Sequence, residues 1–249
     1  MKAIILSAGQ GKRLLPLTSE KPKCLLPLAG KSVLAWQLDV LAVNNVNQVT
    51  VVTGYGAELV DQELAQRRKL CPEQQVEALY NGDYATSDNL VSCWQARSRM
   101  TGDFLLINGD TIFEKKALAW LLAAEKRSVT VTISNKDKYD ADDMKVKLNG
   151  EKLLRIGKDL DLNEVDGESI GMILFRDRGG DWFTDSIAKA LEEEAARKRW
   201  YLSVIDAMAA VADVWTCSIA GLDWQEIDYP ADLENADKLV ESSNLGLPN

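Results

Sequence analysis

The sequence predicts an α/β protein with a Rossmann-like, mostly parallel sheet, flanking helices and a β-rich insertion in the C-terminal half. Short apolar runs alternate with segments of helical periodicity through the first half of the chain, and such alternation is typical of a parallel sheet covered by helices. From about residue 129, β-branched stretches separated by polar turns replace this alternation. The 249 residues, 46% of them hydrophobic, are enough for one large core.

Local patterns predict the elements of the first half. Lys2–Ser7 is an apolar run that glycines follow, as expected of a strand buried on both faces. Ser32 is an N-cap candidate, and the apolar residues from Val33 to Leu41 have helical spacing. The same patterns predict strands at 49–53, 75–80 and 104–108, and helices at 57–69 and about 88–99.

The second half is richer in strands. We expect strands at 129–133, 144–148, 152–156, 169–175 and 215–219, with a hairpin turn at Asn149-Gly150. Helices are expected at about 181–197 and 202–210, and a last one from Pro230. Neither a low-complexity linker nor an internal repeat interrupts the chain. We therefore expect a single domain over residues 1–249, made of two halves at about 1–128 and about 129–249.

The composition narrows the chemistry before any motif is considered. The chain has no histidine, which excludes Ser-His-Asp and Cys-His hydrolases, histidine proton shuttles and His-ligated zinc. Its net charge of -9 opposes nucleic acid or an anionic membrane as the main partner, because both select basic faces. Any catalysis must depend on carboxylates, lysine, arginine, hydroxyls or a hard metal ion.

The cysteines and the hydropathy indicate a cytoplasmic protein. Cys24, Cys71, Cys93 and Cys217 are scattered and form no C-x-x-C pair, so a zinc ribbon or a dense disulfide framework is not expected. No uncharged apolar stretch approaches the roughly 18 residues of a membrane helix. We expect reduced thiols, no membrane insertion and no nucleic acid partner.

The most informative string follows the first strand. It reads Ser7-Ala8-Gly9-Gln10-Gly11-Lys12-Arg13-Leu14-Leu15-Pro16-Leu17-Thr18, with Pro22-Lys23 shortly after. Small residues and glycines let backbone N–H groups approach phosphate oxygens, which Arg13 and Lys23 could also bind. The string lacks the G-K-[ST] ending of a Walker A loop and the third glycine of a dinucleotide fingerprint. On the two glycines alone, an ordinary turn beside a solvated basic residue explains the pattern equally well.

The longer string resembles the signature of the nucleotidyltransferases that join an NTP to a phosphorylated sugar or alcohol. The matching motifs are Gly9-x-Gly11-x-Arg13, Pro16-x-Thr18, Pro22-Lys23, Asn108-Gly109-Asp110, Ile156-Gly157-Lys158-Asp159 and Trp224-Gln225-Glu226-Ile227-Asp228. Within the family, the chain is most similar to the small cytidylyltransferases that act on phosphocholine, inositol 1-phosphate or aminoethylphosphonate. Ser87-Asp88-Asn89-Leu90-Val91-Ser92 points that way, since sugar-specific members usually carry a glycine-rich Gly-Thr-Ala-type segment there.

The resemblance implies a magnesium-dependent transfer of a cytidylyl group from CTP to a phosphorylated alcohol or phosphonate, with release of pyrophosphate. The attacking phosphate oxygen needs no general base, because the second pKa of a phosphate monoester is about 6. The expected partners are CTP or another NTP and a small phosphorylated acceptor, with Mg2+ as the cofactor. A homodimer stays open. The first half would bind the nucleotide and the second half the acceptor.

The resemblance also assigns candidate residues. Lys23, Arg13 and Lys158 are the expected catalytic residues, with Lys158 holding the acceptor's phosphate. Asp110 and Asp228 are the expected magnesium ligands, because Mg2+ prefers carboxylate oxygens and Asp110 follows a strand at the edge where open α/β sheets bind ligands. A strand-end turn at Asp110, a helix cap at Asp228 and a solvated Lys158 are the alternatives. Nucleotide contacts are expected from Ala8, Gly9, Gln10, Gly11, Lys12, Asp88, Asn89 and Gly109.

Aromatic rings or carboxylates could hold the rest of the acceptor. A quaternary ammonium group such as choline binds aromatic faces, at about 0.5 to 2 kcal/mol per contact, and a primary amine would need carboxylates. Met144 stands where phosphocholine enzymes of the family place an aromatic residue, which argues against choline. The acceptor candidates are Met144, Lys158, Glu168, Tyr201, Asp206 and Glu226.

Two other functions stay open. One is a sugar-1-phosphate nucleotidyltransferase that uses UTP or another NTP. The other is a catalytically inactive, regulatory protein with the same fold. The charged set that the resemblance requires is complete here, which favours an enzyme: Arg13, Lys23, Asp110, Lys158 and Asp228.

Overall fold

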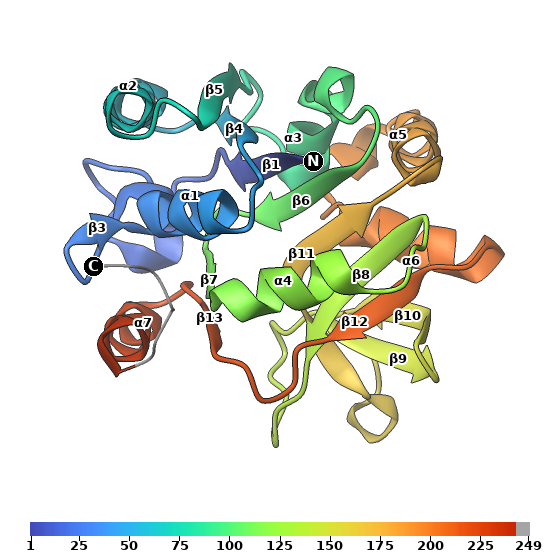
Figure 1. The fold of residues 1–249 in the computed structure, drawn as a ribbon. Coiled ribbons are helices and arrows are strands. Elements are labelled where there is room, and N and C mark those ends of the chain that lie inside the picture. The colour runs from blue at the N-terminus through green and yellow to red at the C-terminus, as the bar shows by residue number, and fades with distance from the viewer. Residues whose placement is uncertain (243–249) are drawn as a thin grey trace. The chain divides into compact units, whose positions relative to one another are not determined.

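The computed structural model describes residues 1–242, and the chain forms two compact units built from interleaved stretches of sequence. Unit 1 consists of Met1–Thr86, Ile107–Ala119 and the described part of Leu222–Asn249; unit 2 consists of Ser87–Leu106 and Trp120–Gly221. The units differ from the expected halves, because the chain leaves unit 1 after residue 86 and returns to it twice. The two returns are the green stretch around β7 and the red stretch around β13 and α7 in Figure 1.

Unit 1 contains the parallel strands expected from the N-terminal alternation. β4 (Gln48–Thr53) pairs in parallel with β1 (Lys2–Ser7) on one side and with β5 (Gln75–Tyr80) on the other. α1 (Val33–Val43) begins after Ser32, whose hydroxyl accepts a helix N–H at 2.9 Å, and α2 (Ala57–Leu70) packs against β5. These elements lie where the local patterns predict them.

Unit 1 also contains short strand pairs that local patterns did not predict. β7 (Thr111–Phe113) pairs antiparallel with β13 (Trp224–Glu226), and β2 (Pro27–Leu28) pairs with β3 (Lys31–Ser32). α7 (Pro230–Ser242) follows β13 and begins at the proline expected to start it.

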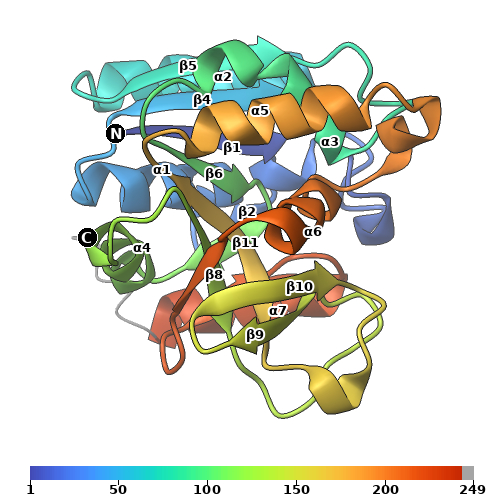
Figure 2. The ribbon, with the colours of Figure 1, turned by 90° about the vertical axis from the view of Figure 1, so that its right-hand side faces the viewer.

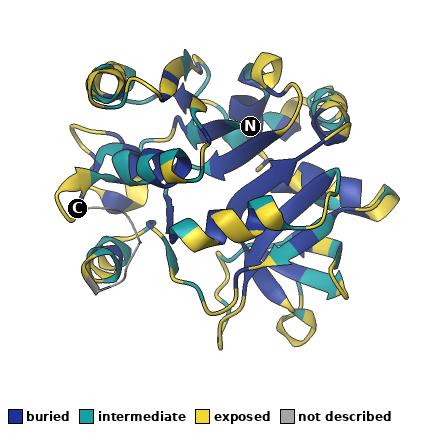
Figure 3. Ribbon diagram, viewed as in Figure 1, coloured by how far each residue is buried: buried dark blue, intermediate teal, exposed yellow. Residues whose placement is uncertain are grey.

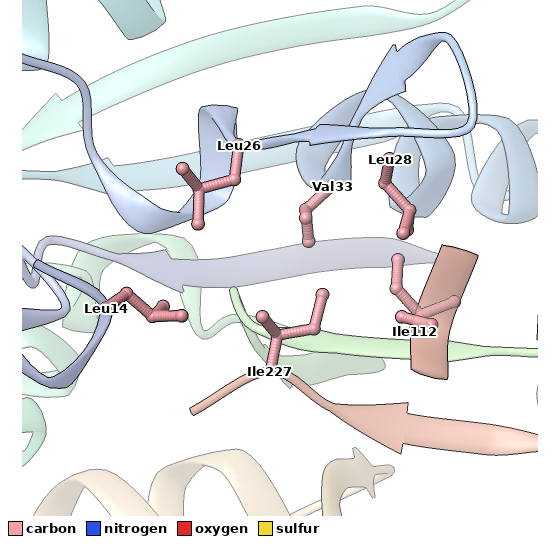
Figure 4. Close-up of a cluster of buried hydrophobic side chains, with 7 residues drawn as sticks. Leu14, Leu26, Leu28, Val33, Ile112 and Ile227 are labelled. Atoms are coloured by element: carbon pink, nitrogen blue, oxygen red, sulfur yellow. The ribbon is translucent and has the colours of Figure 1, made fainter. Parts of the chain in front are cut away.

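One cluster of buried side chains joins these short elements. Figure 4 shows Leu14, Leu26, Leu28, Val33, Ile112 and Ile227 meeting in it. Its members come from the segment between β1 and the end of β2, from the start of α1, from the β7–β13 region and from α7. The cluster therefore fixes the backbone next to Arg13 and Asp228, whose sequence neighbours Leu14 and Ile227 belong to it.

Unit 2 is the β-rich part, with strands in the order β6-β11-β8-β12-β10-β9. The strand bounds are Phe104–Asn108 (β6, whose last two residues belong to unit 1), Val129–Ser134 (β8), Lys145–Asn149 (β9), Lys152–Gly157 (β10), Gly167–Phe175 (β11) and Trp215–Ser218 (β12). β8 pairs antiparallel with β11 and parallel with β12, and β10 pairs antiparallel with β9 and β12. The predicted hairpin at Asn149-Gly150 joins β9 to β10, and Gly150 has a φ of 61°, which favours glycine. Figure 2 shows α6 (Leu202–Val211) over β10, against which it packs.

Stacked aromatic rings form part of the core of unit 2. The ring centroids of Phe104 and Phe175 lie 4.7 Å apart, and those of Phe175 and Phe183 lie 4.8 Å apart. Tyr201 meets Phe183 edge to face at 6.4 Å and is fully buried. Tyr201 is one of the acceptor candidates, and its burial corrects that expectation, because a ring enclosed in the core offers a ligand no surface.

The helices of unit 2 differ most from the sequence-based expectations. α3 (Asn89–Gln95) is shorter than the predicted helix, and α5 (Gly179–Ala190) ends before 197, with a separate 3-10 turn at Glu194–Lys198. Three consecutive glutamates at 192–194 explain the break, because negative charge is unfavourable at a helix C-terminus. α4 (Lys115–Ala123), which begins in unit 1 and ends in unit 2, has no counterpart among the sequence-based expectations.

The fold class is confirmed. Strands and helices alternate through the N-terminal part, and a β-rich insertion follows. In Figure 3 the central strands of each unit are buried, while the exposed residues lie mostly on helices and loops. Among the described residues, no helix has the length and apolar character needed to cross a membrane.

Candidate functional site

The loop after β1 is shaped around a lysine. Gly11 has a φ of 76°, and a Cβ there would lie 2.9 Å from the Cβ of Lys23, so both conformation and space require glycine. The Thr18 hydroxyl donates to the Gly11 carbonyl at 2.9 Å, and the Leu14 N–H donates to the same oxygen at 3.0 Å. A Cβ on Gly9 would meet no atom within 4 Å. The loop thus packs on Lys23 at Gly11 and leaves room for a ligand at Gly9.

Lys23 bridges two carboxylates that lie far apart in the sequence. Its Nζ donates to Asp110 Oδ2 at 2.8 Å and to Asp228 Oδ1 at 2.5 Å, and its side chain is 12% exposed. Burial alone would lower the pKa of Lys23, but the two carboxylates outweigh burial and hold that pKa above its ordinary value. Lys23 therefore carries a fixed positive charge at neutral pH.

The turn that carries Asp110 is fixed by the elements packed against it. A Cβ on Gly109 would overlap the Ser7 hydroxyl oxygen and would lie 2.6 Å from the Leu6 carbonyl oxygen, both in β1. Only glycine allows this close approach. Gln37 of α1 is 1% exposed, and its amide donates to the carbonyls of Asn108 at 2.7 Å and Thr111 at 2.9 Å. The backbone on both sides of Asp110 is therefore held by a buried side chain.

Asp228 reaches the same place through the β7–β13 pair. The Ile227 N–H donates to the Asp110 carbonyl at 2.9 Å, which sets the two aspartates beside each other. Arg13 Nη1 donates to Asp228 Oδ2 at 3.0 Å, and the Arg13 guanidinium lies 5.5 Å from the Tyr229 ring centroid. The Tyr229 carbonyl accepts the first hydrogen bonds of α7. Tyr229 thus occupies the N-cap position, and the carboxylate of Asp228 faces cations instead of capping the helix.

Three carboxylates converge at this point. Asp110, Glu226 and Asp228 each offer an oxygen within 4.8 Å of the others. Asp110 Oδ1 is buried and has no hydrogen-bond partner among residues 1–242. Carboxylate oxygens are the ligands that Mg2+ prefers in proteins, so these residues fit a magnesium ion.

Glu226 belongs to this carboxylate group, although the sequence analysis places it among the acceptor candidates. A sequence signal could have indicated this, since residues two apart in an extended segment point to the same face, and Glu226 lies two residues before Asp228.

Lys158 directly follows β10 in unit 2. Its Nζ lies 3.3 Å from Asp142 Oδ1 and 4.3 Å from the ring centroid of Trp200. Both partners are well exposed, at 49% for the Asp142 side chain and 42% for Trp200. Exposed ion pairs contribute only about 0 to 1 kcal/mol, so Lys158 can exchange these partners for a ligand at low cost.

Asp88 and Asn89 start α3. Asp88 Oδ1 accepts the Asn89 N–H at 2.7 Å, and Asn89 Oδ1 accepts the Tyr201 N–H at 2.8 Å. Burial raises the pKa of the Asp88 carboxyl, and the positive charges of Lys158 and Lys198 oppose that rise. Asp88 therefore senses the charge of Lys158, whereas the side-chain oxygen of Asn89 already serves the fold.

Asp206 and Met144 have structural contacts of their own. The Asp206 carboxylate accepts the Ile156 N–H at 2.8 Å and pairs with the Arg155 guanidinium at 2.9 Å, which ties α6 to β10. Met144 is partly exposed, and its carbonyl accepts the Ser169 N–H at 2.9 Å. The role of Asp206 in the described structure is to join two elements of unit 2.

Comparison with known proteins identifies the family. Residues 2–143, more than half of the chain, match the family described as nucleotidyl transferase. The chain belongs to this family. The matched region contains the glycine loop, Lys23 and Asp110.

Two relatives of this nucleotidyl transferase match nearly its whole length. It is 29% identical over 246 residues to the CMP-5'-(3-aminopropyl)phosphonate synthase of Streptomyces rubellomurinus, covering 95% of this chain and 38% of that protein. It is 27% identical to the bifunctional IPC transferase and DIPP synthase of Aquifex aeolicus, covering 98% and 53% of the two chains. The chain thus spans about half or less of these curated relatives. The solved inositol-1-phosphate CTP transferase from T. maritima shares the fold, with a TM-score of 0.82 at 20% identity over 100% of this chain and 98% of that one.

The nucleotidyl transferase has a second charged cluster in unit 2. Lys136 Nζ lies 2.8 Å from Asp143 Oδ2 and 3.0 Å from Glu168 Oε2. Lys145 is fully buried, and its Nζ donates to the carbonyls of Asp140 at 2.8 Å and Asp143 at 3.3 Å. Glu168, an acceptor candidate, is 4% exposed, and burial raises its pKa to about 7 while Lys136 opposes the rise.

Glu168→Gln is expected to change how the stability of this nucleotidyl transferase depends on pH. The pKa of Glu168 is about 7 in the folded chain, against about 4.3 for an unfolded glutamate. Because Glu168 binds its proton more tightly in the folded chain than in the unfolded chain, it stabilises the wild-type fold at low pH. This contribution is fully present below about pH 4 and is lost as the pH rises through about 7. Glutamine stays neutral, so the free energy of unfolding of the variant relative to wild type should rise by roughly 3 kcal/mol from pH 4.5 to pH 8.

Urea unfolding at intervals between pH 4.5 and pH 8 measures this difference. Glu164→Gln is the matched control, since Glu164 pairs with Lys147 at 2.8 Å but its side chain is 55% exposed. The prediction would be wrong if the free energy of unfolding of Glu168→Gln, relative to wild type, changed no more with pH than that of Glu164→Gln.

Proposed function

We propose that this chain is a magnesium-dependent cytidylyltransferase, which transfers a cytidylyl group from CTP to a small phosphorylated alcohol or phosphonate. The observation that carries the proposal is the Lys23 ammonium held between Asp110 and Asp228, beside a glycine loop with room at Gly9. A fixed cation, carboxylates that suit a divalent ion and open loop N–H groups are what a site for a nucleoside triphosphate needs.

The proposed reaction is a displacement at phosphorus. An oxygen of the acceptor's phosphate or phosphonate forms a bond to the α-phosphorus of CTP. The bond from that phosphorus to the oxygen bridging to the β-phosphate breaks, and its electron pair leaves with pyrophosphate. A phosphate oxygen is already largely ionised near pH 7, so a chain without histidine has no need of a general base. The site must align two anions and balance the charge that develops on the leaving group.

Asp110 and Asp228 would hold the magnesium ion, with Glu226 beside them. The convergence of the three carboxylates and the buried, partnerless Oδ1 of Asp110 support this assignment. When bound, Mg2+ neutralises phosphate charge and polarises the phosphoryl group. The carboxylates alone would repel CTP, so the site depends on the charge of Lys23 to offset part of theirs.

The three basic residues have separate tasks in this proposal. Lys23 is already in place and can bind phosphate oxygens as a point charge. Arg13 has a side chain that is 45% exposed and can exchange Asp228 for a phosphate, to which its guanidinium can donate two parallel hydrogen bonds. Lys158 would exchange Asp142 for the phosphate of the acceptor.

The choice of CTP and of the acceptor class is supported by the proteins compared above. One is named for CMP linked to an aminopropylphosphonate, and another for CTP and inositol 1-phosphate. We extend this chemistry to the present chain, with the loop at Ala8–Gly11 as the proposed nucleotide contact in unit 1 and Met144 as a proposed acceptor contact in unit 2.

Pyrophosphate release tests the proposal. The purified protein is incubated with each of CTP, UTP, ATP and dTTP against phosphocholine, phosphoethanolamine, 2-aminoethylphosphonate, inositol 1-phosphate and hexose 1-phosphates, with Mg2+ or with EDTA. We expect release with CTP and a phospho-alcohol or phosphonate, and none with EDTA. Release with UTP or dTTP and a hexose 1-phosphate would favour the sugar alternative. A folded protein inactive with every pair would favour a regulatory role.

A further inference from the structure

The first turn of α7 contains a carboxylate that binds the backbone of a proposed metal ligand. Asp232 Oδ2 accepts the Tyr229 N–H at 2.7 Å and the Asp228 N–H at 2.9 Å. Tyr229 is the N-cap residue, Pro230 the first helical residue and Asp232 the third. A carboxylate at the third position that returns to the N-cap N–H is one half of a capping box. The second hydrogen bond, which the Asp228 N–H donates, is not part of a capping box.

Asp232 completes a set of contacts that fix Asp228 from both directions. On the N-terminal side, Ile227 is fully buried in the apolar cluster, and its N–H donates to the Asp110 carbonyl at 2.9 Å. On the C-terminal side, the two bonds to Asp232 fix the backbone as it enters the helix. Only the side-chain torsions of Asp228 remain to be set, and these decide where its carboxylate points.

The contacts around Asp232 suit a supporting role better than a direct one. In the described part of the chain, Asp232 accepts two hydrogen bonds, both through Oδ2 and both from backbone N–H groups. Hydrogen bonds to an ionised acceptor are roughly twice as strong as neutral ones. Asp232 is not among the carboxylates that converge with Asp110, namely Glu226 and Asp228. It therefore acts on the site through the backbone of Asp228.

We propose that Asp232 is a positioning residue that orients the Asp228 carboxylate for a divalent cation without touching the cation. This inference rests on the proposed function, because it assumes that Asp228 is a metal ligand. Groups that orient metal ligands in this way typically contribute 10- to 100-fold to metal affinity. The competing explanation is that Asp232 only caps α7 and contributes to stability alone.

The chain offers a matched control on the same helix. Asp237 is also partly buried, and its Oδ1 accepts the Ala29 N–H at 2.7 Å. Among the described residues, no hydrogen bond or ion pair joins it to Asp228. Asp232→Ala and Asp237→Ala each remove an α7 carboxylate that accepts a hydrogen bond from a backbone N–H outside the helix. Asp232→Glu restores the acceptor, since glutamate is the usual residue at this position of a capping box.

Binding of Mn2+ to the 249-residue chain tests the proposal. Free Mn2+ gives an electron paramagnetic resonance signal that is lost on binding, so this signal measures the affinity. The melting temperature of each variant is recorded beside it. We expect about a tenfold weaker Mn2+ affinity for Asp232→Ala, wild-type affinity for Asp237→Ala, and recovery in Asp232→Glu. Both alanine variants should melt below wild type.

Two results would overturn the inference in distinguishable ways. Mn2+ affinity at the wild-type level in Asp232→Ala, while Asp110→Asn abolishes binding, removes the role of Asp232 and leaves the proposed function standing. Wild-type protein that binds no Mn2+, with or without CTP, removes both. A loss of affinity in Asp237→Ala as large as in Asp232→Ala would also overturn the inference, because it would trace the effect to general loosening of α7.

Discussion

Asp110→Asn is expected to lower turnover about a thousandfold while the chain stays folded. The amide keeps the size of the side chain but removes the negative charge that a divalent cation requires. A thousandfold loss corresponds to about 4 kcal/mol of transition-state stabilisation, the order expected when a metal or an equivalent electrostatic group is lost. Stability should change little, because Lys23 keeps its pair with Asp228 at 2.5 Å. Pyrophosphate release and thermal melting with and without Mg2+ measure the two quantities.

Asp39→Asn is the matched control for this experiment. Asp39 also lies between two cations in unit 1, Lys31 at 2.7 Å and Arg67, and its side chain is 19% exposed against 24% for Asp110. It is outside the carboxylate group, so its replacement should leave turnover near the wild-type level. An Asp110→Asn protein that is active and still dependent on magnesium would refute the metal assignment.

Lys23→Met is expected to lower turnover at least a hundredfold and to make the protein's stability depend on divalent cations. The methionine fills much of the space of the lysine stem but leaves Asp110, Glu226 and Asp228 facing one another without the ammonium. Removing one partner of a buried ion pair typically costs about 3 to 5 kcal/mol, which at this chain length lowers the melting temperature by roughly 6 to 20 °C. A divalent cation can replace the missing charge, so Mg2+ should raise the melting temperature of the variant more than that of wild type.

Differential scanning fluorimetry over a series of Mg2+ concentrations, without nucleotide, measures this effect. Lys31→Met serves as the control, since Lys31 has an exposed side chain and pairs with Asp39 at 2.7 Å. Equal Mg2+ shifts in wild type and Lys23→Met would show that the carboxylate group does not bind the cation.

Local patterns carried much of the information about the fold and about the glycine loop. The run Lys2–Ser7, the cap at Ser32 and the hairpin at Asn149-Gly150 each involve neighbours in the sequence, so spacing and residue type suffice to predict them. The glycine string after the first strand is also local, whereas the left-handed conformation of Gly11 and its contact with Lys23 are findings of the structure.

The features that the sequence did not predict depend on contacts between segments that are distant in the chain. β7 and β13 have three residues each, too few for a periodic signal, and their pairing joins residues roughly a hundred positions apart. This pairing brings Glu226 to Asp110. No local pattern predicts the pairing itself, although the two-residue spacing indicates that Glu226 and Asp228 share a face. Tyr201 is the reverse case, a residue that the sequence assigned to the site and the fold removes from it. Its sequence neighbourhood suits a binding residue, but its ring packs in an aromatic core.

The interleaved construction of unit 1 has a consequence for protein synthesis. The glycine loop and Lys23 leave the ribosome before Asp110, and Glu226 and Asp228 emerge only with the stretch that begins at Leu222. Until that stretch pairs with β7, the ammonium of Lys23 lacks one of its two carboxylates, and the three-carboxylate group does not exist. A nascent chain shorter than this is therefore unable to assemble the proposed cation site, however well its first strands have already paired.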